Sequence, residues 1–128
     1  MARTYSAFLP QVQIPNLDAL QSAIHSLKFK LDLDDSYSPL SFSGYLPCTL
    51  DDEDAGVSIR FNESINAGDQ VTTITLQWGG DPREQVSATM LAAALAHSFG
   101  AVVNDTHGQT TSAERLIAEA RQQFSNLD

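Results

Sequence analysis

The side chains with the greatest capacity for chemistry in this sequence are three histidines, one cysteine and a run of acidic residues. The histidines, His25, His97 and His107, show no H-x-x-x-H spacing, and a single cysteine excludes a C-x-x-C pair. The usual spacings that direct two ligands at one metal ion are therefore missing. Asp105 and His107 stand two apart on a predicted loop, which leaves a zinc or iron site as an alternative to a solvated turn. We expect no metal and no cofactor.

Cys48 follows Pro47 on a predicted loop. A cysteine paired with a histidine from elsewhere in the chain could act as a nucleophile. A lone cysteine is more often a small apolar residue, and the G-x-S-x-G pattern of hydrolases is missing. We therefore expect a protein that is not an enzyme, and a small enzyme built around Cys48, Asp105 and His107 remains as an alternative. A single cysteine forms no intrachain disulfide, which fits a reducing cytosol.

Two glycines precede a predicted helix in the segment Trp78-Gly79-Gly80-Asp81. Helix N-termini attract anions because their amides are unpaired and the helix dipole is positive there. However, the P-loop and G-x-G-x-x-G patterns are absent, and the Asp81 carboxylate would occupy the amides and repel a phosphate. We interpret this segment as a tight turn between a strand and a helix.

The charge balance limits the classes of partner. The 128 residues carry sixteen acidic and seven basic side chains, a formal charge of −9. This argues against a nucleic-acid-binding protein, which needs Lys and Arg to meet phosphates. The densest acidic group, Asp51-Asp52-Glu53-Asp54, is placed on a loop and lacks the spacing of an EF-hand or of paired catalytic carboxylates. It is either a solvated loop or a surface for a basic partner.

As a binding surface, the acidic run would join other acids in one negative face that attracts a cationic partner and speeds association. Interface hot spots are rich in Trp and Tyr, so Tyr45 and Trp78 are candidate anchors. Trp78 keeps phase with Ile74 and Leu76, which favours a place in the core. The predicted partner-binding residues are Asp32, Asp34, Asp35, Tyr45, Asp51, Asp52, Glu53, Asp54 and Glu63.

Three helices are predicted from apolar residues at helical spacing. Asn16 is a suitable N-cap for a helix that ends near Leu27. The segment Asp81-Pro82-Arg83-Glu84 is a capping box with proline at N1, and its helix should end near Phe99, before Gly100. The segment Thr111-Ser112-Ala113-Glu114 is a second capping box and opens a final helix.

Strands are predicted where apolar and polar residues alternate. Residues 28–34 place Phe29, Leu31 and Leu33 on a core face. Residues 57–61 and 74–78 also alternate, and we expect a hairpin with a loop over residues 62–70. Shorter strands are expected around Val12 and Ile14, at residues 42–46 and, as a buried strand, at residues 101–103.

These elements predict one α+β domain over residues 1–128. We expect a two-layer sandwich, with a mainly antiparallel sheet of four to five strands and helices packed on one face. No apolar stretch approaches the ~18 residues needed to cross a bilayer, and no secretory signal or lipidation motif is visible. We therefore expect a cytoplasmic protein with no membrane partner.

One part of the chain resembles a known group of proteins. A strand ending in Trp78-Gly79-Gly80-Asp81, an alanine-rich helix and the segment Gly100-Ala101-Val102-Val103-Asn104-Asp105 form a pattern that covers residues 76–105. The pattern resembles small bacterial proteins that include immunity proteins of contact-dependent and type VI secretion toxins. The matching positions are structural, so the resemblance supplies no site residues. It implies a cytosolic antidote that binds one cognate toxin domain and blocks its active site.

A small acidic secretion chaperone or adaptor that binds an effector protein is the alternative. Such proteins are usually dimers, and the final helix offers the best dimer face through Leu116, Ile117 and Phe124. An acidic immunity protein would complement a toxin with a basic cleft.

Overall fold

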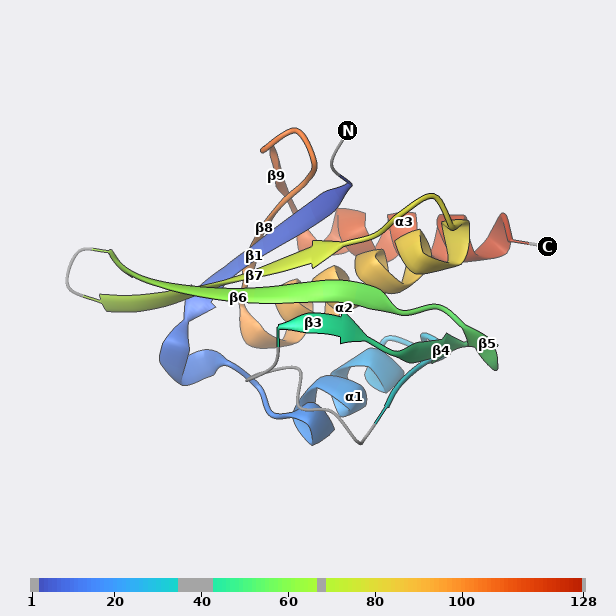
Figure 1. Cartoon of the computed structure of the whole chain (residues 1–128), viewed down its shortest axis with the longest axis horizontal. Coiled ribbons are helices and arrows are strands. Elements are labelled where there is room, and N and C mark those ends of the chain that lie inside the picture. Colours follow the sequence, from blue (N-terminus) through green and yellow to red (C-terminus); the bar gives the residue numbers. More distant parts are fainter. Residues whose placement is uncertain (1–2, 35–42, 67–68, 128) are drawn as a thin grey trace.

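The computed structural model describes residues 3–34, 43–66 and 69–127, and it confirms the α+β class (Figure 1). The helices are α1 (Leu17–Ser26), α2 (Pro82–Phe99) and α3 (Ala113–Ser125), with a short 3₁₀ turn, η1, at Gln11–Gln13. All strand neighbours among these residues pair antiparallel. The predicted antiparallel sheet with packed helices is therefore confirmed, and it is larger than four to five strands.

The main sheet has six strands in the order β3-β6-β7-β1-β8-β9. They are β3 (Gly44–Leu46), β6 (Val57–Asn66), β7 (Asp69–Gln77), β1 (Thr4–Pro10), β8 (Val102–Asn104) and β9 (Thr110–Thr111). Since β1 is antiparallel to both β7 and β8, those two strands are parallel, and α2 connects them across β1. A second, smaller sheet has the order β2-β4-β5, with β2 (Leu31–Leu33), β4 (Cys48–Leu50) and β5 (Glu53–Asp54).

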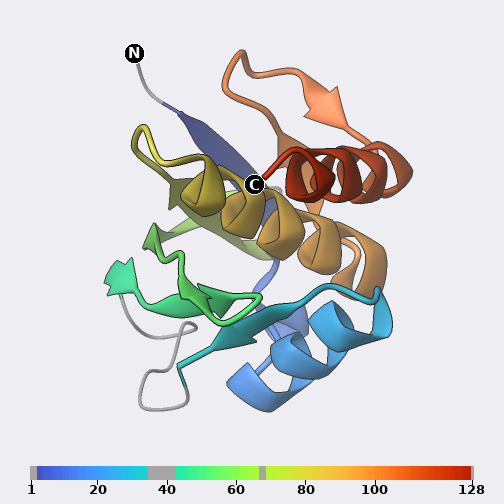
Figure 2. The ribbon, with the colours of Figure 1, turned by 90° about the vertical axis from the view of Figure 1, so that its right-hand side faces the viewer.

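The helices form one layer, in which α2 lies between α3 and α1 (Figure 2). Residues 86–95 of α2 are all buried, because this helix contacts strands of both sheets and both other helices. Small side chains at Ala88 and Ala92 allow that close approach. On the other face of the sheet, polar residues alternate with the buried ones, as Ser58 and Arg60 do around Ile59.

The caps confirm two predicted helices and correct the third. Asn16 accepts a hydrogen bond from the Ala19 amide, and α2 runs from Pro82 to Phe99 with Gly100 in the left-handed conformation. The N-cap of α3 is Ser112, which accepts from the Arg115 amide, so the predicted cap at Thr111 was one residue early. Thr111 instead belongs to β9.

Three details of the strand predictions were wrong. The first strand is Thr4–Pro10, whereas Val12 lies in η1 with 92% of its surface exposed. The alternation of Tyr5, Ala7 and Leu9 toward the core determines this strand, and Pro10 ends it. The loop expected at residues 62–70 is mostly hairpin, because pairing continues to Asn66 and Asp69. Strand β8 is only half buried, since Val102 is 52% exposed.

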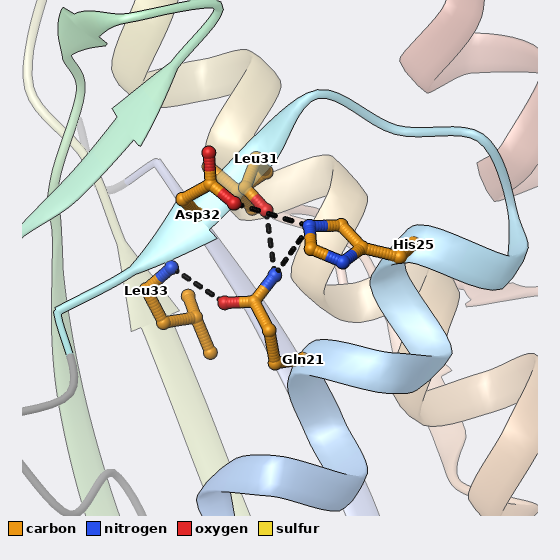
Figure 3. A network of polar contacts seen from close by, with 5 residues as sticks. All are labelled: Gln21, His25, Leu31, Asp32 and Leu33. Carbon is orange, nitrogen blue, oxygen red and sulfur yellow. Dashed lines mark hydrogen bonds and ion pairs between the residues drawn. The ribbon is translucent and has the colours of Figure 1, made fainter.

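The free edge of β2 is covered by one side chain of α1 (Figure 3). The Gln21 amide donates to the Leu31 carbonyl oxygen at 2.9 Å and accepts from the Leu33 amide at 2.7 Å. It thus replaces the two hydrogen bonds that a neighbouring strand would make, which protects an edge that could otherwise pair with another chain. Beside it, His25 Nε2 lies 3.1 Å from Asp32 Oδ1.

We expect Gln21→Ala to lower the free energy of unfolding by about 2 kcal/mol, because two partly buried backbone groups lose their partner. Urea denaturation measures this change. His25→Ala is the comparison variant: its ring contacts the side chains of Gln21 and Asp32 at exposed positions only, so the expected change is below about 0.5 kcal/mol. Equal midpoints for Gln21→Ala and the wild type would show that the amide does not stabilise β2.

Candidate protein-binding surface

The acidic run forms a tight hairpin turn between β4 and β5 instead of the expected loop. Asp51 and Asp52 have φ angles of 50° and 70°, and Leu50 pairs with Glu53 on either side of them. Two successive residues at positive φ characterise a type I′ turn, whose twist suits a two-residue hairpin. Aspartate adopts this conformation more readily than most residues. The two carboxylates are therefore carried on a defined backbone.

Two acids of the run contact basic side chains. Glu53 forms an ion pair with Arg83 in the first turn of α2, and Lys30 Nζ lies 3.8 Å from Asp51 Oδ1. These pairs are too exposed to contribute much to stability, and the first joins the hairpin to the first turn of α2. Asp52 and Asp54 are both exposed.

The pairing in the small sheet brings Asp32 and Asp54 to the same face. Thr49 is the direct partner of Asp32 on one side and of Asp54 on the other. Directly paired residues project to the same side of a sheet, so both carboxylates belong to its outer face. Asp34 follows β2 and is partly buried. This part of the predicted negative face is thus assembled from β2 and β5.

Two predicted residues do not join this group in the structure. Glu63 lies about 20 Å along β6 from Val57, toward the outer end of the β6–β7 hairpin, whereas the small sheet lies at the other end (Figure 1). The hairpin that replaces the predicted loop carries Glu63 away. Asp35 lies outside the described residues.

Tyr45 supplies an aromatic group at the junction of the two sheets. It is 51% exposed, and it is the only aromatic residue among the exposed large apolar side chains of the described chain. Its ring lies over Gly56, where an added Cβ would overlap it. Desolvation raises the pKa of Tyr45, the carboxylates of Glu84 and Asp54 act in the same direction, and a hydrogen bond with the Gly56 backbone opposes them. The ring therefore lies within electrostatic range of both carboxylates.

Sequence reasoning missed Glu84 and Arg83 as members of this surface. Both were assigned only to the first turn of the helix, where Asp81 does cap the Arg83 amide. The Glu84 carboxylate accepts a hydrogen bond from the Gly79 amide at 3.2 Å. Nothing in the sequence links Glu84 to Tyr45, because only the packing of α2 on the sheet brings them together. The Gly79-Gly80 segment is thus a strand-to-helix turn whose first amide is already paired.

The residues of the enzyme alternative are separated. Cys48 is buried in β4, and burial raises the pKa of its thiol to about 12, with the Asp34 carboxylate acting in the same direction. The thiolate needed for nucleophilic attack is therefore scarce at neutral pH. Asp105 Oδ1 accepts from the amides of His107 and Gln109 in the β8–β9 turn, away from β4 (Figure 1). Among the residues described, no cluster of three or more His, Cys, Asp or Glu could hold a metal ion.

The dimer face expected on α3 is used within the chain. Leu116 and Ala120 are buried, and Ile117 and Phe124 pack against the core. α3 makes these contacts chiefly with α2. Leu116 and Ala120 are therefore withdrawn from any dimer face, while Ile117 and Phe124 are only partly covered.

No known protein family, curated protein or solved structure matches this chain. In the described residues, no helix has the length and apolar character to cross a membrane. The function of this surface is consequently inferred from its own residues and their arrangement.

Proposed function

We propose that this protein is an immunity protein, which binds a cognate secreted toxin domain and blocks the toxin's active site. The observation that carries this proposal is the half-exposed Tyr45 ring, which packs on Gly56 beside the acidic hairpin and feels the charges of Asp54 and Glu84. An aromatic face with carboxylates at its border suits a Lys or Arg side chain from a basic cleft. Such an antidote acts in the cytoplasm of the cell that makes it.

The exposed acids and the ring have different roles in this proposal. Asp32, Asp52 and Asp54 attract the basic cleft over a distance and raise the association rate, an effect that salt screens. Tyr45 is buried on contact and slows dissociation. The net charge of −9 adds to the attraction of a basic partner.

Co-expression tests the function directly. A bacterium producing the product of the gene immediately upstream should stop growing, and this protein should restore growth. If the upstream product is harmless but becomes soluble or is secreted only with this protein, the chaperone class replaces the immunity class.

The surface is tested by reversing Asp52 and Asp54 to lysine, which leaves Asp51 and Glu53 in their ion pairs. We expect the association rate with the toxin domain to fall at least about tenfold at low salt. Tyr45→Ala should raise the dissociation rate about tenfold or more. The control variant reverses Glu63 and Glu114 to lysine. It changes the net charge by the same amount, but both residues lie away from the acidic β4–β5 hairpin. Equal rates for the test and control variants would remove the hairpin from the interface.

A further inference from the structure

A second candidate site surrounds Trp78, which follows the last residue of β7. Two open hollows of about 370 and 480 Å³ adjoin there, and both are lined by Trp78, Gln85, Thr106 and His107. They lie where β7 ends, where α2 begins, and where the β8–β9 turn and α3 approach. Asp81 and Pro82 line the larger hollow, and the neighbouring Arg83 pairs with Glu53 of the acidic hairpin.

The smaller hollow has an aromatic wall that is held from behind. The rings of Tyr5 and Trp78 lie 5.2 Å apart, centroid to centroid, at 33°. The buried Thr89 hydroxyl lies 3.4 Å from the Tyr5 hydroxyl oxygen and 2.8 Å from Gln123 Oε1. This network fixes the Tyr5 ring and the Gln123 amide, both of which line the hollow.

The charge of the smaller hollow is negative. Its lining residues include the carboxylates of Asp105 and Glu119 and no Lys or Arg. Burial raises the pKa of Tyr5, a hydrogen bond with Thr89 opposes this, and the charges of Glu119 and Asp105 add to the rise. The negative charges of both carboxylates are therefore felt at the Tyr5 side of the aromatic wall. The amides of Gln85, Gln122 and Gln123 add further acceptors.

We infer that the hollow between Trp78, Asp105 and Glu119 binds a guanidinium group, presented as an arginine side chain by the protein partner. A guanidinium is planar and stacks on aromatic rings, while its forked donors reach carboxylate and amide oxygens. The compact ammonium of lysine cannot do both equally well. Only the source of the arginine rests on the proposed function, since the chemistry of the hollow is independent of it.

The single tryptophan makes this inference measurable, because Trp78 lines this hollow and its fluorescence responds to a ligand bound there. Titration with N-acetyl-arginine amide should give a saturable change with a dissociation constant on the order of millimolar, as for a weak single-group ligand. N-acetyl-citrulline amide has nearly the same shape without the charge and should give none. An equal response to both compounds would overturn the inference, as would a saturable response to N-acetyl-glutamate amide alone, which would indicate an anion site at Arg3 and His107.

Two variants on α3 test the carboxylate. Glu119→Gln should weaken arginine binding at least about fivefold, because a charge-assisted hydrogen bond is lost. Arg115 Nε lies 3.3 Å from Glu119 Oε1, so Arg115→Gln frees this carboxylate and should tighten binding. Unchanged affinity in both variants would overturn the inference. These titrations contain no toxin, so they do not depend on whether the protein neutralises one. Arginine binding can fail while toxin neutralisation succeeds, and neutralisation can fail while arginine binding succeeds. Each proposal is therefore tested separately.

Discussion

Replacing Gly56 with alanine should lower the free energy of unfolding by about 3 kcal/mol, the upper range for forcing extra atoms into a packed site. Gly56 is buried between β5 and β6, and a Cβ there would lie 2.6 Å from the Leu46 carbonyl oxygen and would overlap the Tyr45 ring. The carbonyl belongs to β3, which is paired with β6 and cannot move freely. The ring would have to leave its place over Gly56, so the variant should also weaken partner binding.

Urea denaturation of Gly56→Ala and of three comparison variants checks this expectation. Gly79→Ala is the matched control, since its Cβ would meet only Glu84 Oε1 at 3.7 Å. It should change stability by less than about 1 kcal/mol, in the stabilising direction, because alanine restricts the unfolded chain. In a Tyr45→Ala background, Gly56→Ala should lower the free energy of unfolding by less than it does in the wild type. The difference is the part of the loss that comes from overlap with the Tyr45 ring. A Gly56→Ala protein as stable as the wild type would show that Tyr45 does not lie over this glycine.

Alkaline pH should destabilise the protein through Cys48. The thiol ionises near pH 9.0 when unfolded, whereas burial raises its native pKa to about 12. Between these values the unfolded chain loses a proton that the native protein keeps. The protonated thiol therefore makes its full contribution to the free energy of unfolding below pH 9. As the pH rises toward the native pKa, this contribution is lost by about 1.4 kcal/mol per pH unit and ~4 kcal/mol in all.

The free energy of unfolding of the wild type and of Cys48→Ala, measured from pH 8 to about 11, isolates this effect. The alanine variant should start lower, because a buried side chain is truncated, but should fall less steeply. Tyrosines contribute equally to both proteins. In native protein the thiol should also resist alkylation, and it should react once urea unfolds the chain. Parallel pH profiles for the two proteins would show that Cys48 ionises as it would in water.

Local signals predicted the helices well, whereas the sheets depended on contacts that the sequence does not display. Asn16 and Asp81 are caps that act within one turn, so α1 and α2 begin where expected. Strands β5 and β9 have two residues each, too few for a period to be recognised. The central position of β1 follows from partners near residues 70 and 103, and no local pattern reveals it.

The candidate surface was predictable in composition and not in arrangement. The sequence identified the acidic run and Tyr45, but it placed the run on a loop. The hairpin required Asp51 and Asp52 to accept positive φ angles, which a pattern of charges does not encode. The approach of Glu84 to Tyr45 and the pairing of Glu53 with Arg83 arise from the packing of α2 between the sheets. Trp78, expected in the core, packs against it and also lines an open hollow.

The central strand of the main sheet is also the first to be synthesised. β1 pairs with β7 and β8, which leave the ribosome roughly 60 to 90 residues later. At about 5–20 residues per second, β1 waits several seconds or more for its first partner. During that time Tyr5, Leu9 and both edges of the strand have no native neighbour, a state that favours aggregation. Formation of the sheet must therefore follow translation of β7, and slow, late folding is the kinetic consequence of this strand order.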